Sequence, residues 1–250
     1  MSNRMKIKEL DEVVVKFVGD SGDGMQLTGT LFSDAAVKAG NDLATFPDYP
    51  AEIRAPHNTV AGVSGYQVNI GKNRILTSGD LCDVLVAMNP ASLKANLKWV
   101  KTGATILVDT DTFEESIFSK AGYDSNPLEN GSLSSYNVLK APITTMTREA
   151  LADLKVEGKM ADKTRNMFAL GMMLYLFNRQ LDSTMNYIKS KFGKNQTVLD
   201  SNIAVLKAGY NYADTIEALP STFIVPPAPI EKGRYRNITG NIATAWGLLA

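Results

Sequence analysis

Residues 13–25 read Val-Val-Val-Lys-Phe-Val-Gly-Asp-Ser-Gly-Asp-Gly-Met, and this stretch decides the fold. The apolar run 13–18 predicts a strand, a loop with Gly19, Gly22 and Gly24 follows, and a helix is predicted from residue 25 to residue 39. In this arrangement backbone N–H groups and a helix dipole face an anionic ligand. The glycine spacing differs from the Gly-x-Gly-x-x-Gly pattern of dinucleotide-binding folds.

Two carboxylates make this loop unusual for a phosphate site. Asp20 and Asp23 lie between the glycines. A carboxylate about 4 Å from a phosphate charge costs about 1 kcal/mol in water, and about 4 kcal/mol at an effective dielectric constant near 20. A tight strand-to-helix turn without any ligand is therefore the alternative interpretation.

Composition excludes several classes of protein. Lys plus Arg and Asp plus Glu are both 26 in 250 residues, so the net charge of zero argues against nucleic acid as a main partner. The single cysteine, Cys82, leaves no partner for a disulfide and too few ligands for a four-cysteine cluster. The charged N-terminus resembles no signal peptide, and no apolar run is long enough for a membrane span. We expect a cytoplasmic protein that does not enter the membrane.

A βαβ unit is the clearest further element. The run 84–88 predicts a buried strand, Asn89 and Pro90 begin a helix expected to end at Gly103, and 105–109 predicts the next strand. Together with the opening unit, this predicts a three-layer α/β/α sandwich with a mostly parallel, Rossmann-like sheet.

The other segments are assigned more coarsely. Three prolines in 46–58 predict a functional surface loop, and 110–135 is expected to be an irregular insertion. Strands are predicted near 66–70 and, at the outer edge, 136–140; helices are predicted over 165–178, 182–192 and 197–212.

The C-terminal part predicts a change of domain. Residues 218–233 are rich in proline and predict an extended linker, and an amphipathic helix starts near 235. Because that helix stops without a cap, we expect the chain to be a fragment, with a first domain over 1–215, a linker over 216–233 and the start of a second domain over 234–250.

The sequence offers no complete catalytic set. The Gly-Asp-Gly triplet at 22–24 suggests thiamine diphosphate, but the paired asparagines needed to close the magnesium site are absent. His57 is the only histidine, which excludes a multi-histidine metal site, and a solvated side chain is expected for it. Cys82 precedes a buried strand and is expected to be a packed thiol. We predict no catalytic residue and no metal ligand in this chain.

Four motifs in order resemble the gamma domain of 2-oxoacid:ferredoxin oxidoreductases. They cover Gly19–Met25, Phe46–Pro56, Val63–Val68 and Asn166–Gly171, and Asn237–Asn241 resembles the start of a pyrimidine-binding domain. This fused order is similar to the alpha subunit of the members that use 2-oxoglutarate, and the resemblance covers roughly residues 12–250.

The resemblance implies a role in a larger enzyme. Such complexes oxidise a 2-oxoacid to an acyl-coenzyme A and pass the electrons to ferredoxin. Thiamine diphosphate with Mg²⁺ and the iron–sulfur cluster would lie in missing domains or partner subunits, including a beta subunit. The gamma-type domain would help to bind coenzyme A and to assemble an oligomeric complex, and the fragment alone is expected to be inactive.

Positions that match the family motif are the candidate coenzyme A ligands. The resemblance implies that the glycine loop approaches the ligand and that asparagines and cations contact it; the set is Gly19, Gly22, Asp23, Gly24, Arg54, Lys163, Arg165, Asn166 and Asn202. The pyruvate-using relatives carry lysines in the helix after the loop. This chain instead has Gln26, Thr28, Thr30 and Ser33, which puts direct phosphate contacts by the loop in question. Arg54 is either a substitute cation or an interdomain contact.

Two other functions compete with this interpretation. The glycine and proline-rich loops could form a docking module without catalytic function, which the acidic loop residues favour. An independent nucleotide-binding enzyme, such as an NAD-linked dehydrogenase, is disfavoured by the glycine spacing and by the missing acidic residue after a second strand.

Overall fold

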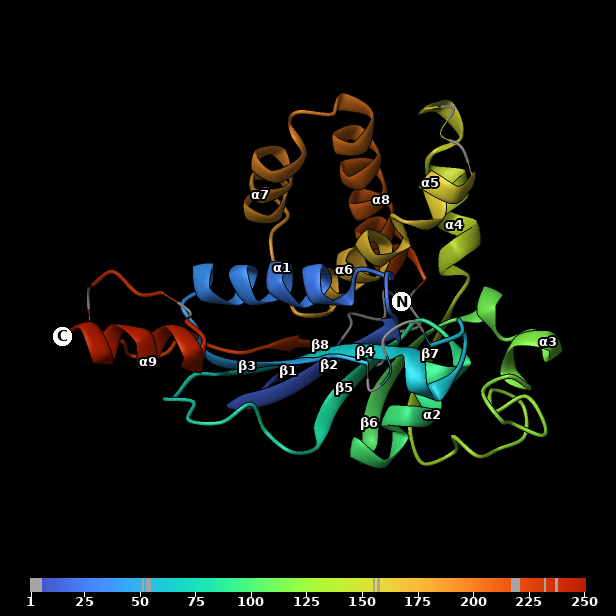
Figure 1. Cartoon of the computed structure of the whole chain (residues 1–250), viewed down its shortest axis with the longest axis horizontal. Coiled ribbons are helices and arrows are strands. Elements are labelled where there is room, and N and C mark those ends of the chain that lie inside the picture. The colour runs from blue at the N-terminus through green and yellow to red at the C-terminus, as the bar shows by residue number, and fades with distance from the viewer. Residues whose placement is uncertain are drawn as a thin grey trace.

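The computed structural model describes residues 6–50, 52, 55–154, 156, 158–216, 221–231, 233–236 and 238–250. Its centre is a six-stranded sheet in the order β3-β4-β2-β5-β6-β7 (Figure 1). The strands are β2 (Glu12–Asp20), β3 (Asp42–Asp48), β4 (Val63–Gly71), β5 (Cys82–Ala87), β6 (Val100–Asp109) and β7 (Asn137–Ala141). Only β4 runs against the others, because β2, β5, β6 and β7 pair in parallel and β4 is antiparallel to both β2 and β3. The predicted mostly parallel sheet is confirmed.

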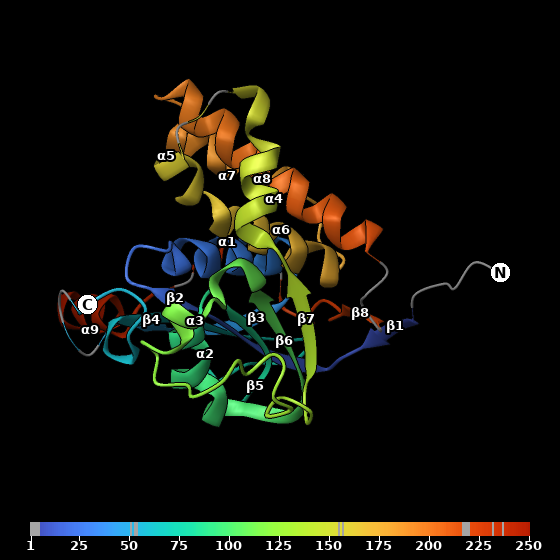
Figure 2. The ribbon, with the colours of Figure 1, turned by 90° about the vertical axis from the view of Figure 1, so that its right-hand side faces the viewer.

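Helices cover both faces of the sheet (Figures 1 and 2). One face carries α1 (Met25–Lys38), α4 (Ile143–Ala150), α5 (Gly158–Asp162), α6 (Arg165–Leu176), α7 (Asp182–Phe192) and α8 (Gln196–Thr215). The opposite face carries α2 (Pro90–Asn96), α3 (Glu115–Phe118) and most of the irregular segment between β6 and β7. Short 3₁₀ turns are η1 (Val60–Gly62), η2 (Leu97–Trp99), η3 (Thr110–Thr112) and η4 (Ala152–Leu154).

Strand β2 is apolar on both faces because both are covered. Val13, Val15 and Phe17 pack in the core beneath α1 and α6, whereas Val14 and Val18 pack in the smaller core on the α2 side. An interior strand of a sheet with helices on both faces has no solvent side, so its sequence shows a continuous apolar run.

Two predicted boundaries are wrong. The helix after Asn89 was expected to reach Gly103, but α2 ends at Asn96 and β6 already begins at Val100, which pairs with Cys82. The proline-rich segment 46–58 is not a loop throughout, because residues 46–48 end β3. This strand lies at the sheet edge, where the missing N–H of Pro47 is tolerated.

The remaining predicted elements are confirmed within a few residues. Strands β5, β6 and β7 and helices α6, α7 and α8 occupy the expected segments, and 110–135 holds only η3 and α3. Helix α4 was not predicted. No helix in the described part of the chain is long and apolar enough to cross a membrane.

The segment predicted as a linker contains a strand. Strand β8 (Ser221–Ile224) pairs in parallel with β1 (Lys6–Glu9). Phe223 of this strand lies 5.4 Å from Phe177 in ring-centroid distance, and Phe177 lies 5.2 Å from Phe32 of α1. This aromatic row holds the start of the segment on the domain. The predicted domain boundaries themselves stay a prediction.

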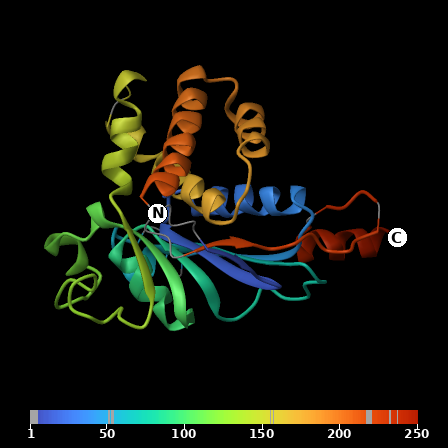
Figure 3. The ribbon, with the colours of Figure 1, turned by 180° about the vertical axis from the view of Figure 1, so that it is seen from behind.

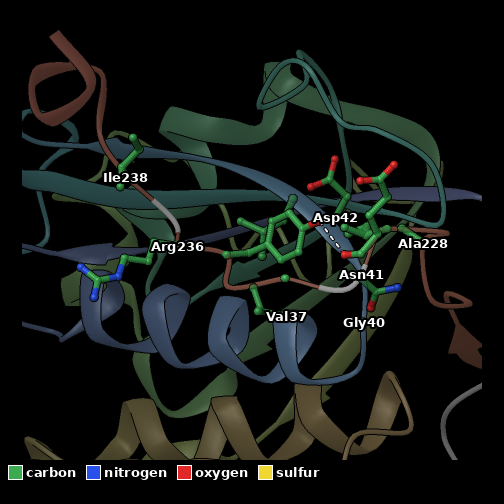
Figure 4. Close-up of a pocket in the computed structure, with 12 residues that line it drawn as sticks. Val37, Gly40, Asn41, Asp42, Ala228, Arg236 and Ile238 are labelled. Carbon is green, nitrogen blue, oxygen red and sulfur yellow. Dashed lines mark hydrogen bonds between the residues drawn. The ribbon is translucent and has the colours of Figure 1, made fainter. Parts of the chain in front are cut away.

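Beyond β8 the chain follows the end of α1 and leads to α9 (Gly240–Leu249), which has no buried residue (Figure 3). Asn41 donates to the carbonyls of Val225 and Pro226, and Ala228 N donates to Gly40 O. Figure 4 shows the pocket of about 510 Å³ that this route encloses against the end of α1. The Asn41 contacts thus hold the chain beyond β8 against the end of α1.

Candidate functional site

The glycine loop lies where the sheet changes its winding direction. It follows the carboxyl end of β2, whose parallel neighbour is β5. Helix α1, after β2, covers one face, and α2, after β5, covers the other. In open α/β sheets, the crevice between two such strands is the usual place of a ligand.

The backbone of the loop explains two of its glycines. Gly22 has φ 105° and Gly24 has φ 77°, values that residues with a side chain rarely adopt. A Cβ at Gly22 would meet nothing within 4 Å, so this residue borders open space. A Cβ at Gly24 would instead lie 2.4 Å from the amide nitrogen of Asn166, so this glycine allows close contact between the loop and α6.

Asp23 closes the loop through both of its carboxylate oxygens. Its Oδ2 accepts a hydrogen bond from Asp20 N at 2.8 Å, and its Oδ1 lies 2.6 Å from Arg165 Nη2. The two side chains are only 13% and 19% exposed. Burial acts to lower the pKa of Arg165, but the Asp23 carboxylate, together with the more distant charges of Asp109 and Asp162, outweighs it and the pKa is raised. Arg165 was predicted to offer its positive charge to a phosphate, but Asp23 of the same chain already neutralises that charge.

Asn166 joins the same loop from the first turn of α6. Its amide donates weakly to Gly24 O at 3.3 Å and Thr28 Oγ1 at 3.4 Å. The residue is 3% exposed, and within the described part of the chain its Oδ1 has no hydrogen-bond partner. A buried acceptor without a partner is uncommon and needs a donor.

Asp20 has a role that the sequence analysis missed. Its carboxylate is buried, and its Oδ2 accepts from Asn58 N at 2.7 Å and lies 3.4 Å from His57 Nδ1. Asp20 thus ties the glycine loop to the proline-rich segment. The only signal of this role in the sequence was that an acidic residue is unexpected in a loop predicted to bind an anion. The side chain of His57 is 84% exposed, which confirms the expected solvated histidine.

The other predicted site residues are less clearly connected. Lys163 is exposed in the turn two residues before α6. Asn202 is buried in α8, where its amide donates to Val198 O of the same helix at 2.7 Å. Among the residues that the structure describes, Arg165 and Asn166 form side-chain hydrogen bonds to the glycine loop, whereas Lys163 and Asn202 do not. Arg54 lies outside the described residues.

Asp109 is a further buried acid near Arg165. It ends β6, is 0% exposed, and accepts hydrogen bonds from Thr144 N at 3.3 Å and Thr144 Oγ1 at 2.6 Å. Burial raises its pKa, and the bonds from Thr144 and the charge of Arg165 oppose this only in part. The sequence showed that the predicted strand ends in Asp109, but it did not show that Thr144 of α4 bonds this carboxylate.

The family follows from the extent of the sequence match. Residues 14–212 match the family described as Pyruvate ferredoxin/flavodoxin oxidoreductase. The chain belongs to this family. The resemblance seen in the four motifs is thereby confirmed.

Curated members of the family share different amounts of sequence with the chain. It is 46% identical over 242 residues to the 2-oxoglutarate oxidoreductase subunit KorA of Mycobacterium tuberculosis, which covers 97% of the chain and 37% of that protein. It is 29% identical over 208 residues to the ketoisovalerate oxidoreductase subunit VorA of Methanothermobacter marburgensis, covering 82% of the chain and 37% of that subunit. The chain therefore spans little more than a third of the length of these relatives.

Solved structures show the same fold. The 2-oxoglutarate:ferredoxin oxidoreductase of Magnetococcus marinus, solved with 2-oxoglutarate, coenzyme A and succinyl-CoA, matches with a TM-score of 0.67 at 22% identity, over 88% of this chain and 34% of that one. The gamma subunit of a keto/oxoacid ferredoxin oxidoreductase from Geobacter sulfurreducens matches with a TM-score of 0.56 at 19% identity, over 82% of this chain and 97% of that one. The fold is therefore that of a whole gamma subunit.

Proposed function

We propose that this chain is the gamma-type domain of a 2-oxoglutarate:ferredoxin oxidoreductase and contributes to coenzyme A binding and subunit assembly. The observation that carries the proposal is the 46% identity to KorA over 97% of the chain. The complex would convert 2-oxoglutarate to succinyl-coenzyme A in the cytoplasm with reduction of ferredoxin. Thiamine diphosphate, Mg²⁺ and the iron–sulfur cluster would belong to other domains and to a beta subunit.

The residues around the glycine loop fit coenzyme A in two respects. Gly22 borders open space at the switch of the sheet, and Asn166 Oδ1 is a buried acceptor without a partner in the described structure. Coenzyme A carries amide and hydroxyl donors as well as phosphates. Gly19, Gly22 and Gly24 would approach it, and Lys163, Asn166 and Asn202 would bind it. When bound, it supplies the thiol that receives the acyl group.

Calorimetric titration of coenzyme A into the 250-residue chain and into the full complex tests this role. We expect Asn166→Ala to weaken binding about tenfold, the equivalent of one lost hydrogen bond. Asn211→Ala is the matched control, because Asn211 is exposed on α8. Dephospho-coenzyme A reports whether Lys163 contacts the 3′-phosphate: Lys163→Ala should weaken only the intact ligand. Unchanged affinity in the Asn166 variant of the complex would refute binding at this loop.

One observation favours the docking function as a second candidate. The Asp23–Arg165 pair leaves the loop without a free buried cation among the described residues, which suits a protein contact better than a phosphate. The Asp20 contacts to His57 and Asn58 connect this loop to the proline-rich segment. If docking is the main role, Asp20→Asn should impair assembly with the beta subunit while coenzyme A affinity in the assembled fraction stays unchanged.

A further inference from the structure

The irregular segment between β6 and β7 carries the only asparagine–glycine pair of the sequence, Asn130–Gly131. Figure 2 shows this segment running over the α2 side of the sheet, opposite α1 and α6. Leu133 is buried and Leu128 packs against the same small core, whereas residues 129–132 are all exposed. The pair is therefore held between two apolar anchors and is open to water.

An asparagine followed by glycine can lose its side-chain amide without an enzyme. The backbone nitrogen of the glycine attacks Cγ of the asparagine, and a bond between them forms as the Cγ–Nδ2 bond breaks. The amide leaves as ammonia, with the proton that the glycine nitrogen gives up, and a cyclic imide remains. Water then opens the imide at one of its two carbonyl carbons, which yields aspartate or isoaspartate. Glycine favours the attack because it has no Cβ to hinder the approach.

The contacts of the Asn130 side chain favour this attack. Its Oδ1 accepts a hydrogen bond from Ser132 N at 3.0 Å, and its Nδ2 donates to Ser125 Oγ at 2.9 Å. Negative charge develops on Oδ1 when Cγ is attacked, and a backbone donor aimed at that oxygen stabilises it. The fold thus places an electrophile, already polarised, next to the glycine.

The attacking nitrogen is not engaged elsewhere. Among the residues that the structure describes, the N–H of Gly131 donates to no acceptor. Gly131 has φ 79°, and a Cβ at this position would meet nothing within 4 Å. Its surroundings are therefore open to the water that the second step consumes.

Two asparagines of the same segment lack these conditions. Asn126 precedes Pro127, whose nitrogen carries no proton to lose. Asn137 precedes Val138, whose branched side chain hinders the approach. Asn137 also lies in β7, where its amide donates to Gly103 O at 2.8 Å. The segment thus contains its own controls.

We propose that Asn130 is a site of spontaneous deamidation in the folded protein, converted by water to aspartate and isoaspartate with release of ammonia. The product adds a negative charge beside Glu129, which lines a cavity together with Lys140 and Arg148. The isoaspartate form also routes the main chain through the side-chain carbon, which makes it a substrate for carboxyl methyltransferases that recognise isoaspartate. The proposal does not depend on the role of the glycine loop.

Incubation of the 250-residue chain and of the full complex above neutral pH, followed by trypsin digestion and mass spectrometry, tests the proposal. Trypsin cleaves after Lys120 and Lys140, so one peptide carries Asn126, Asn130 and Asn137. We expect Asn130 to convert at least about tenfold faster than Asn137, because only Asn130 precedes a residue without Cβ. Asn126 should stay unchanged. Labelling by a methyltransferase specific for isoaspartate measures the share of that product.

A synthetic peptide of residues 121–140 is the unfolded reference under the same conditions. Asn130 in the folded chain should convert as fast as in the peptide or faster, and at most about threefold slower, because the bond from Ser132 N is kept. Asn130→Gln keeps an amide but would have to close a larger ring, so the acidic form of the peptide should be absent. Stronger protection of Asn130 in the chain or in the complex would overturn the proposal, as would a smaller ratio between the rates at Asn130 and Asn137.

Discussion

Replacing Gly209 by alanine is expected to destabilise the fold, although alanine is the better helix former. Gly209 lies in α8, where α8 crosses α6. A Cβ at this position would lie 2.1 Å from Phe168 O and 2.8 Å from Phe168 C. The crossing is reciprocal, since a Cβ at Gly171 of α6 would lie 2.2 Å from Leu206 O. Both obstacles are backbone atoms, which cannot rotate away.

The size of the effect follows from two opposing contributions. Alanine gains about 1 kcal/mol in helix propensity over glycine. To restore an ordinary van der Waals distance the two helices must separate by about 1 Å, and overpacking of a close-packed interior costs about 1–3 kcal/mol or more. Because backbone is displaced on both helices, we expect a cost of about 3–4 kcal/mol, above the usual range. Subtracting the gain of about 1 kcal/mol leaves a net loss of about 2–3 kcal/mol, which lowers Tm by about 4–12 °C.

Urea unfolding followed by circular dichroism measures this loss. Gly247→Ala is the matched control, since this helical glycine of α9 would place its Cβ in open space. Its free energy of unfolding should be unchanged or should rise by up to about 1 kcal/mol, the gain in helix propensity, and it should not fall. Adding Gly171→Ala to Gly209→Ala should cost less than the sum of the two single changes, because either one already separates the same helix pair. A Gly209→Ala chain as stable as the native one would refute the close crossing.

Three further predictions test other parts of the structure. Burial raises the pKa of the Cys82 thiol to about 11, so Cys82 should react with a thiol reagent only at the rate of unfolding, and denaturant should expose it. Burial also raises the pKa of Asp109, so its protonated form stabilises the fold. This stabilisation is complete below the unfolded pKa near 4 and is lost as the pH rises through the pKa of the folded state. In a plot of unfolding free energy against pH, Asp109→Asn should therefore flatten the curve in that window. Asn41→Ala removes two hydrogen bonds to residues 225 and 226 and the acceptor of Arg179, and should cost about 2 kcal/mol in urea unfolding; no loss would exclude Asn41 as the anchor of that segment.

Local patterns predicted much of the sheet and of its helices. The apolar runs of β2 and β5 are continuous because these strands are covered on both faces, and a continuous apolar run can be recognised from the sequence alone. Boundaries failed where a tertiary pairing decided them. Val100 continues an apolar helical stripe in the sequence, yet it pairs with Cys82 and starts β6. Strand β3 was missed because Pro47 indicates a loop unless the strand is known to lie at the edge of the sheet, where a proline is tolerated.

The candidate site shows the same division. The glycine loop, the start of α6 at Asn166 and the family were all evident from motifs in the sequence. That Asp23 binds Arg165 was not, because 142 residues separate them and no periodicity links such a pair. The pairing changes the chemistry of the loop, since it removes the cation that the motif offers to a phosphate.

By itself the sequence determined the α/β class, the family and the place of the glycine loop, because hydrophobic period, turn residues and ordered motifs are local properties. Only the tertiary structure decided which charges meet. It joined Asp23 to Arg165 and Asp20 to the proline-rich segment, and it left Arg179 buried without a carboxylate among the described residues. The free energy of a charge depends on its burial and on its neighbours in space, and both are set by the packing of distant segments.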